Sequence, residues 1–309
     1  MNEPNSRLPH CIRSQQFTRA KLEKLFALAD KLHAGQRSYA LKDKIVISLF
    51  YEPSTRTRLS FESAVLRLGG SIIGTENAAE FSSAIKGESL GDSIRIISSY
   101  GDVIILRHKD DDAAERAATQ SSIPVISAGC GKGQHPTQAL LDLYTIRQRR
   151  GKIDGLRIAM CGDLTHGRTV RSLAYLLGKF KDVHITFVAP GTLRIGRDIL
   201  NYLDRHDVRY EETDRLADVV PTVDVIYTTR VQRERIPGLS HDAFVRLQRE
   251  YRIDAALAGR MRADAFIMHP LPRNDELSAD VDDTSHAAYF QQAQNGLWVR
   301  MSLLHMMFS

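Results

Sequence analysis

The amino-acid sequence predicts an α/β fold with two domains, each a mainly parallel sheet flanked by helices, joined by interdomain helices. Short β-rich apolar runs alternate with amphipathic segments, a pattern that is typical of parallel sheets with crossover helices. This pattern restarts after Arg149-Arg150-Gly151, which indicates a domain boundary there. The length of 309 residues fits about two domains of roughly 150 residues each.

In the first half, aliphatic and β-branched runs predict four strands, and amphipathic spacing predicts five helices. The expected strands are Ile45–Phe50, Ser71–Gly74, Val103–Leu106 and Val125–Ser127. The expected helices are Arg19–Leu32, Thr55–Leu68, Ser89–Ser99, Ala113–Thr119 and Pro136–Arg149. The last of these helices would leave the first domain, which is predicted to span residues 1–136.

The second half repeats the alternation and predicts a second domain over residues 150–285. Its expected strands are Arg157–Cys161, His184–Ala189, Val225–Thr228 and Ala265–Met268. Its expected helices lie near Thr169–Lys179, Ile195–Leu203 and Ala243–Glu250. The segment His286–Met306 also has a helical pattern. We expect the C-terminal part, residues 286–309, to pack back on the first domain.

The composition excludes several classes of protein. Apolar residues make up 43% and charged residues 26% of the chain, as in ordinary globular proteins. No apolar run approaches the length of a membrane span, and the polar N-terminus does not resemble a secretory signal. The cysteines Cys11, Cys130 and Cys161 are far apart, which is typical of a reducing cytosol and offers no zinc knuckle. The expectation is a cytoplasmic protein without a membrane partner.

The charge balance of 42 − 37 = +5 is weakly basic. The basic residues are scattered, and no helix-turn-helix signature accompanies them, so a nucleic-acid partner is not expected. Arginine-rich chains suit anion chemistry because the guanidinium group grips carboxylates and phosphates with two hydrogen bonds.

The sharpest local motif is Ser54-Thr55-Arg56-Thr57-Arg58, which follows a predicted strand and opens a predicted helix. Ser54 is expected to cap this helix, and a helix N-terminus with hydroxyl and guanidinium groups is an anion site, above all for phosphate. The alternative is an ordinary capped helix with solvated arginines. Three hydroxyls and two arginines in one strand–helix turn favour the phosphate site.

A second strand–turn–helix, Gly162-Asp163-Leu164-Thr165-His166-Gly167-Arg168-Thr169, differs by one letter from a P-loop. Arg168 stands where the P-loop has lysine, whose compact ammonium reaches the β- and γ-phosphates. The stretch also lacks the three-glycine dinucleotide fingerprint. A nucleotide-binding ATPase built on this turn remains an alternative, and otherwise the turn presents one arginine to an anion.

Two further segments carry polar side chains after predicted elements. His135 follows a glycine-rich stretch and could donate to a carbonyl oxygen, with Gln138 one turn further along the helix; alone, a satisfied loop histidine would be the simpler explanation. Arg230 and Gln232 point to the same side of an extended segment and could clamp a carboxylate.

The segment His269-Pro270-Leu271-Pro272-Arg273 follows the strand Ala265–Met268. Its two prolines fix the backbone and remove two N–H donors, so the Pro270 and Leu271 carbonyls could face a ligand amino group. Nearly every motif lies at the carboxyl end of a predicted strand, where open α/β sheets bind ligands. Together they offer cationic and neutral donors but no metal cluster, which predicts a site that binds and positions anions.

Three of these motifs, Ser54-Thr55-Arg56-Thr57-Arg58, His135-Pro136-Thr137-Gln138 and His269-Pro270-Leu271-Pro272-Arg273, resemble the aspartate/ornithine carbamoyltransferase family in their order and spacing. Proline at position 270, where ornithine enzymes have cysteine, favours the aspartate branch. The resemblance implies transfer of the carbamoyl group from carbamoyl phosphate to the amine of L-aspartate, in de novo pyrimidine biosynthesis. It implies no metal and no organic cofactor.

The resemblance also implies roles for individual residues. Those that would bind carbamoyl phosphate are Ser54, Thr55, Arg56, Thr57, Ser82, Lys86, Arg107, His135, Gln138, Pro270 and Leu271. Those that would bind aspartate are Lys86, Arg168, Arg230, Gln232 and Leu271. The catalytic set would be Arg56, Thr57, Lys86, Arg107 and His135.

Members of the family donate a mobile loop to the neighbouring chain of a trimer, so Ser82 and Lys86 would complete an adjacent active site in a homotrimer. Glu52, Arg168 and Arg235 match an ion-pair set that joins the domains. Binding of a regulatory chain is left open, as are three other functions: a carbamoyltransferase with a different amine acceptor, an ATPase, and an anion-binding module that has lost catalysis.

Overall fold

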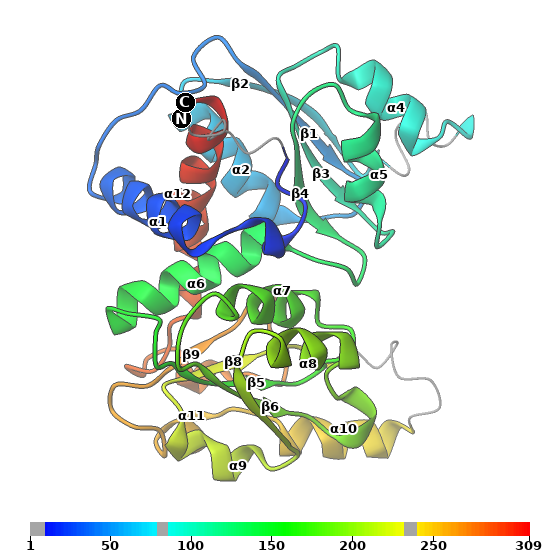
Figure 1. The fold of residues 1–309 in the computed structure, drawn as a ribbon. Helices are drawn as coiled ribbons and strands as arrows, with labels where there is room; N and C mark the ends of the chain where they lie inside the picture. The colour runs from blue at the N-terminus through cyan, green and yellow to red at the C-terminus, as the bar shows by residue number, and fades with distance from the viewer. Residues whose placement is uncertain (1–9, 79–85, 232–239) are drawn as a thin grey trace. The chain divides into compact units, whose positions relative to one another are not determined.

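The computed structural model of the chain describes residues 10–78, 86–231 and 240–309, which are drawn in colour in Figure 1. These residues form two compact units. The first comprises Met1–Leu141 together with Gln294–Ser309, and the second comprises Asp142–Ala293. Each unit contains one parallel sheet covered by helices, which confirms the predicted fold class.

The sheet of the first unit has the strand order β2-β1-β3-β4, and all its pairs are parallel. The strands are β1 (Ile45–Phe50), β2 (Ser71–Glu76), β3 (Val103–His108) and β4 (Val125–Cys130). The helices are α1 (Arg19–His33), α2 (Thr55–Arg67), α4 (Leu90–Ile97), α5 (Ala113–Gln120), the start of α6 (Pro136–Arg150) and most of α12 (Tyr289–Phe308).

Apolar residues on both faces bury the two inner strands of this sheet. Ile47 and Leu49 of β1 pack with Ile104 of β3 against Ile94 of α4 and Ala117 of α5. Figure 1 shows α1, α2 and α12 on the other side of the sheet from α4 and α5. The continuous apolar runs that predicted these strands therefore result from burial on both faces.

The sheet of the second unit has the order β7-β6-β5-β8-β9, again with parallel pairs throughout. Its strands are β5 (Arg157–Cys161), β6 (His184–Val188), β7 (Arg209–Thr213), β8 (Val225–Thr228) and β9 (Phe266–Met268). Its helices include α7 (Arg168–Leu177), α8 (Arg197–Asp204), α9 (Leu216–Val219), α10 (His241–Glu250) and α11 (Ala255–Ala258). Figure 1 shows α7 and α8 on one side of the sheet and α9 and α11 on the other.

The predicted strands are all present, but the sequence analysis missed β7 and the four-residue helices α9 and α11. Strand β7 reads Arg-Tyr-Glu-Glu-Thr and lies at the edge of its sheet, where most of its side chains are exposed. An edge strand without an apolar face gives no alternating signal. The last helix begins at Tyr289 and not at His286, and its final residues Gln294–Ser309 belong to the first unit.

In each sheet the strand order reverses its direction at one point. In the first sheet the chain passes from β1 to β2 on one side and continues with β3 on the other side of β1. In the second sheet β6 and β7 extend from one side of β5, while β8 and β9 extend from the other. Open α/β sheets bind ligands at such reversals, outside the carboxyl ends of the strands. The expected ligand-binding positions are therefore the carboxyl ends of β1 and β3 in the first sheet, and of β5 and β8 in the second.

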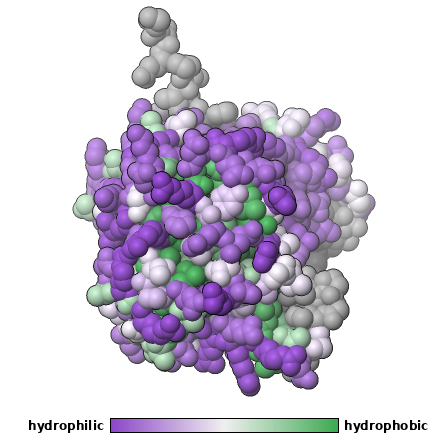
Figure 2. Space-filling view, turned by 60° about the horizontal axis from the view of Figure 1, so that its bottom comes forward, coloured by the Kyte–Doolittle hydropathy of each residue, from purple (hydrophilic) through white to green (hydrophobic). Residues whose placement is uncertain are grey.

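The surface is mostly polar. Figure 2 shows a face on which hydrophilic side chains dominate and apolar side chains appear only in small patches. Exceptions on the first unit include Leu59 and Leu66 of α2 and Ile73 of the edge strand β2, which are 54%, 62% and 46% exposed. In the part of the chain that the structure describes, no helix is both long enough and apolar enough to span a membrane.

Candidate active site

The Ser54 motif forms the turn between β1 and α2, as predicted. Ser54 occupies the position before the first helical residue, but its side chain makes no capping hydrogen bond, so the expected cap is absent. The first N–H groups of a helix have no partner within the helix. Because the Ser54 side chain does not use them, these donors suit an incoming anion.

The two arginines of this turn have different surroundings. Arg58 pairs with Glu62 at 2.7 Å and also with Glu76 of β2, so its charge is compensated within the unit. Arg56 is exposed, and partial desolvation lowers its pKa from the ordinary value while leaving it charged near neutral pH. Thr57 is buried beside it. Of the two, Arg56 is the one suited to a phosphate.

Strand pairing brings Arg107 to this turn. Arg107 in β3 lies opposite Phe50, the last residue of β1, and its carbonyl oxygen accepts a hydrogen bond from the Tyr51 N–H at 2.9 Å. Its guanidinium group lies 3.6 Å from a Glu52 carboxylate oxygen and donates to the Ala128 carbonyl oxygen at 3.3 Å. The structure thus places Arg107 beside the Ser54 turn at the reversal between β1 and β3.

His135 and Gln138 lie at the start of α6, and both are buried. The loop before them rests on Asp111, whose carboxylate accepts a hydrogen bond from the Lys132 N–H at 2.6 Å. Gly131 has a φ of +45°, and a Cβ there would approach Asp111 Oδ1 to 1.9 Å. The glycine therefore allows the loop that carries His135 to lie directly on the turn after β3.

In the second unit, the turn between β5 and α7 lacks the features that a P-loop needs. The Asp163 carboxylate is buried and accepts hydrogen bonds from the backbone N–H and ring Nδ1 of His166. Thr169, at the position of the Mg²⁺-binding hydroxyl, hydrogen-bonds to Tyr227. Because the Thr169 hydroxyl is already bonded to Tyr227 and an arginine replaces the P-loop lysine, the structure argues against the ATPase alternative.

The ends of β5 and β8 meet closely, which places Arg230 on a well-defined backbone. Thr229 is buried, and both its N–H and its hydroxyl donate to the Cys161 carbonyl oxygen, at 2.9 and 3.0 Å. Arg230 follows at the surface and is half-buried. Arg168 is the first residue of α7 in the same unit, six residues after Gly162. Both arginines thus follow strands that flank the reversal of the second sheet.

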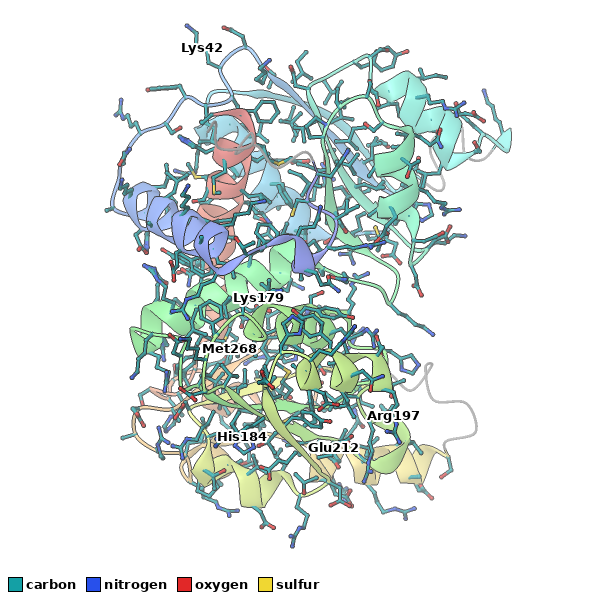
Figure 3. All side chains as sticks on the ribbon, viewed as in Figure 1. Lys42, Lys179, His184, Arg197, Glu212 and Met268 are labelled. Atoms are coloured by element: carbon teal, nitrogen blue, oxygen red, sulfur yellow. The ribbon has the colours of Figure 1, made fainter. Side chains whose placement is uncertain are left out.

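The loop after β9 carries Pro270 and Leu271. Figure 3 labels Met268, the last residue of β9, which His269 follows directly. Leu271 has a φ of +51°, in the left-handed region, and the peptide bond to Pro272 is cis. A non-glycine residue in that region is uncommon and persists only where surrounding contacts hold it.

Some predicted site residues cannot be placed. Ser82, Gln232 and Arg235 lie outside the described residues. Lys86 is described, and it is exposed. Within the described ranges, no group of three or more His, Cys, Asp and Glu side chains is arranged to hold a metal ion.

A buried polar network in the second unit was missed by the sequence analysis. The Asp142 carboxylate accepts hydrogen bonds from the Tyr227 hydroxyl at 2.9 Å and from the Gln292 amide at 2.6 Å. The Gln292 side-chain oxygen accepts from the His269 N–H at 2.8 Å. The one signal in the sequence is Asp142 itself, which interrupts the apolar run Ala139-Leu140-Leu141 and Leu143.

These features define an α/β protein with cationic and backbone donors at the reversals of two parallel sheets. Comparison with known proteins gives the family. Residues 9–148 match the carbamoyl-P binding domain of the aspartate/ornithine carbamoyltransferases, and residues 154–307 match their Asp/Orn binding domain. The chain belongs to the aspartate/ornithine carbamoyltransferase family.

Individual relatives are similar over nearly the whole chain. The chloroplastic aspartate carbamoyltransferase of Arabidopsis thaliana is 51% identical over 97% of this chain and 78% of its own length. The aspartate carbamoyltransferase catalytic subunit of Chromobacterium violaceum is 47% identical over 96% of each chain.

Solved structures show the same fold. Aspartate transcarbamoylase from Trypanosoma cruzi, in complex with N-(phosphonacetyl)-L-aspartic acid, is 39% identical with a TM-score of 0.91 and covers 98% of this chain and 97% of its own. The catalytic subunit of M. jannaschii aspartate transcarbamoylase is 42% identical with a TM-score of 0.89 and covers 97% and 98%.

Proposed function

We propose that this chain is an aspartate carbamoyltransferase, which transfers the carbamoyl group of carbamoyl phosphate to L-aspartate and releases N-carbamoyl-L-aspartate and phosphate, in de novo pyrimidine biosynthesis. The observation that carries the proposal is the identity of 47 to 51% to chains that bear this name, over at least 96% of this chain. A Trypanosoma cruzi relative at 39% identity was solved with carbamoyl phosphate and aspartate together.

The reaction forms one bond and breaks one. The aspartate amine attacks the carbamoyl carbon, the new C–N bond forms, and the bond from that carbon to the phosphate oxygen breaks. The leaving phosphate takes the electron pair, and it also takes up the proton that the amine loses. Negative charge grows on the carbamoyl oxygen during the attack, so preorganised donors around this oxygen accelerate the reaction. Holding two anionic substrates together supplies further acceleration.

The first unit binds the phosphate and activates the carbonyl. The Ser54 turn with Thr55, Arg56 and Thr57 binds the phosphate, assisted by Arg107. The support for this assignment is that β1 and β3 pair so that Arg107 lies beside the turn. Thr57, Arg107 and His135 polarise the carbamoyl oxygen, and Gln138 accepts from the carbamoyl amino group. His135 directly precedes α6 and its carbonyl oxygen accepts from the Gln138 N–H at 3.0 Å, which supports their joint role.

The second unit binds aspartate and the carbamoyl amino group. Arg168, Arg230 and Gln232 bind the two carboxylates, and the Pro270 and Leu271 carbonyls accept from the carbamoyl amino group. Two arginines beside one sheet reversal support the assignment of the carboxylates, because each can form two charge-assisted hydrogen bonds to a carboxylate. The acceptor is therefore an amine with two carboxylates, which distinguishes aspartate from ornithine.

The enzyme acts as a homotrimer in which Ser82 and Lys86 serve the site of the neighbouring chain. Support comes from the exposed Lys86 and from the edge strand β2, whose Ile73 is exposed together with Leu66 of α2. A sheet edge with exposed apolar side chains is a surface that proteins normally cover. The cysteines are all free and buried, which fits a reducing compartment, and we place the enzyme in the cytoplasm.

The test is a colorimetric assay for carbamoyl-aspartate with the purified chain, run in parallel with ornithine as acceptor and with ATP hydrolysis. We expect product from carbamoyl phosphate and aspartate alone. Product formed only with ornithine would assign a different acceptor, and phosphate release from ATP would revive the nucleotide alternative. Binding of carbamoyl phosphate without turnover would indicate a module that has lost catalysis.

A further inference from the structure

We propose that His269, held in one tautomer by Glu276, is a positioning residue that aims the Pro270 carbonyl at the carbamoyl amino group. The inference rests on the proposed function, because it concerns the substrate of that reaction. It assigns roles to His269 and Glu276, which belong to the second unit.

The His269 ring makes two hydrogen bonds of fixed polarity. Its Nδ1 lies 2.7 Å from the Leu271 backbone nitrogen, and its Nε2 lies 2.9 Å from Glu276 Oε1. A backbone N–H can only donate, so Nδ1 must be the acceptor. The neutral ring then carries its proton on Nε2, where it donates to Glu276. Both side chains are buried, so solvent does not compete for these bonds.

The bond to Leu271 controls the neighbouring carbonyl. The N–H of Leu271 and the C=O of Pro270 belong to one peptide group, and in a trans peptide the two point in opposite directions. Holding the N–H on His269 therefore turns the Pro270 oxygen away from the imidazole. The same contact helps to hold Leu271 at its φ of +51°, which sets the direction of the next carbonyl.

Glu276 is suited to fix the tautomer because it remains a carboxylate. Burial alone raises the pKa of Glu276, but the hydrogen bonds from His269 and from the Asn274 N–H outweigh it, and the pKa is lowered from its ordinary value. The Asn274 bond to Oε1 measures 3.0 Å. An ionised carboxylate only accepts hydrogen bonds, so it selects the ring form with the proton on Nε2.

The backbone of His269 is anchored as well as its ring. Its N–H donates to the side-chain oxygen of Gln292, and the amide of Gln292 donates to the Asp142 carboxylate. The same carboxylate also accepts a hydrogen bond from the Tyr227 hydroxyl. Tyr227 lies in β8, two residues before Thr229. The loop that presents the Pro270 carbonyl is thus tied through buried side chains to the strand that leads to Arg230, so both proposed substrate contacts share one rigid support.

A comparison of carbamoyl phosphate with acetyl phosphate separates a positioning role of His269 from a general effect on stability. The two compounds differ only in that carbamoyl phosphate has an amino group where acetyl phosphate has a methyl group. The test measures the affinity of the full-length protein for each by calorimetry. Wild type should bind carbamoyl phosphate at least about tenfold more tightly. In the His269→Gln variant the side-chain amide can still reach Glu276, but no atom at the place of Nδ1 accepts from the Leu271 N–H. We expect it to lose most of this preference, with acetyl phosphate affinity unchanged.

His269→Asn is the matched variant, since its side-chain oxygen can stand near the place of Nδ1 and accept from Leu271. It should keep most of the preference for carbamoyl phosphate. Equal preference in wild type and His269→Gln overturns the positioning role and leaves the proposed function intact. A wild type that binds neither compound overturns the proposed function itself, and a wild type without any preference overturns the role of the carbonyl.

A second pair of variants covers the case in which His269→Gln does not fold. Glu276→Gln keeps an oxygen that accepts from Nε2, whereas Glu276→Met has a similar size and no acceptor. We expect Glu276→Met to lose the preference severalfold and Glu276→Gln to keep it, with thermal unfolding recorded for both. An unchanged preference in folded Glu276→Met contradicts the inference.

Discussion

Gly162 and Thr229 approach each other so closely that a Cβ at position 162 would lie 2.2 Å from the Thr229 carbonyl oxygen. Gly162 also has a φ of +105°, a backbone conformation that residues with a side chain rarely adopt. This contact joins the turn before Arg168 to the segment before Arg230. The spacing between the two arginines therefore depends on the absence of a side chain at one residue.

Gly162→Ala should reduce both stability and the use of aspartate. The clash and the left-handed backbone together predict a loss of about 1 to 3 kcal/mol in the free energy of unfolding. Urea denaturation and the kcat/KM for aspartate measure the two effects. Gly191→Ala is the control, because no atom lies within 4 Å of its added Cβ. A wild-type kcat/KM in Gly162→Ala would show that the contact does not set the arginine spacing.

Arg230→Ala should selectively impair the use of aspartate. Loss of a charge-assisted hydrogen bond to a carboxylate costs about 1.5 to 3 kcal/mol, or roughly 10- to 150-fold in kcat/KM for aspartate. The affinity for carbamoyl phosphate should change little. Arg209→Ala, at an exposed position of β7, serves as the control. If Arg230→Ala instead abolishes carbamoyl phosphate binding, the roles of the two units are reversed.

Substrate binding should be ordered, with the phosphate ligand first. The turn that we propose binds the phosphate belongs to the first unit together with Arg107, while Arg168 and Arg230 belong to the second. We expect calorimetry to show weak aspartate binding by the free protein and much tighter binding once carbamoyl phosphate or phosphate is present. The same aspartate affinity under both conditions would rule out this order.

Mixed trimers should recover activity if Lys86 serves a neighbouring chain. Arg56→Ala and Lys86→Ala chains, each inactive alone, are dissociated, mixed equally and reassociated. Random mixing makes roughly three-quarters of the rings mixed, each with one intact site in three, so roughly a quarter of wild-type activity should return. If both residues served the site of their own chain, mixing would restore nothing.

Acid should reveal the contribution of Glu276 to stability. Because the pKa of Glu276 is lowered in the folded protein from its ordinary value of 4.5, the unfolded chain binds more protons near that pH. Its stabilisation is complete above pH 4.5 and is lost as the pH falls through the folded pKa. The difference in unfolding free energy between wild type and Glu276→Gln, followed by urea denaturation, should therefore shrink on acidification. A difference independent of pH would contradict this assignment.

The elements that sequence reasoning predicted well are those with a strong local pattern. The buried strand β1 and the helix α2 after Ser54 both have such a pattern, and so does the buried part of β3. The pairing of Arg58 with Glu76 had no local signal, because it joins α2 to the end of the neighbouring strand.

Longer-range polar contacts were even harder to predict from the sequence. The bond between Gln292 and Asp142 joins residues 150 positions apart, so no periodicity or motif spacing could indicate it. The missing hydrogen bond of Ser54 shows the converse, since a preferred capping residue stands at the right position without capping. Local chemistry predicts which residues can act, while tertiary packing decides what they contact.

The discontinuous first unit affects the order in which the chain can fold during synthesis. Its final part, Gln294–Ser309, is translated after the whole of the second unit, and this segment includes the fully buried Val299, Leu303 and Leu304. Arg300 of the same helix lies over the Phe61 ring, 5.0 Å from its centroid. The second unit is continuous in sequence, so on a ribosome it can complete its core first. The first unit, although begun before the second, reaches its final packing only when the last turns of α12 have been synthesised.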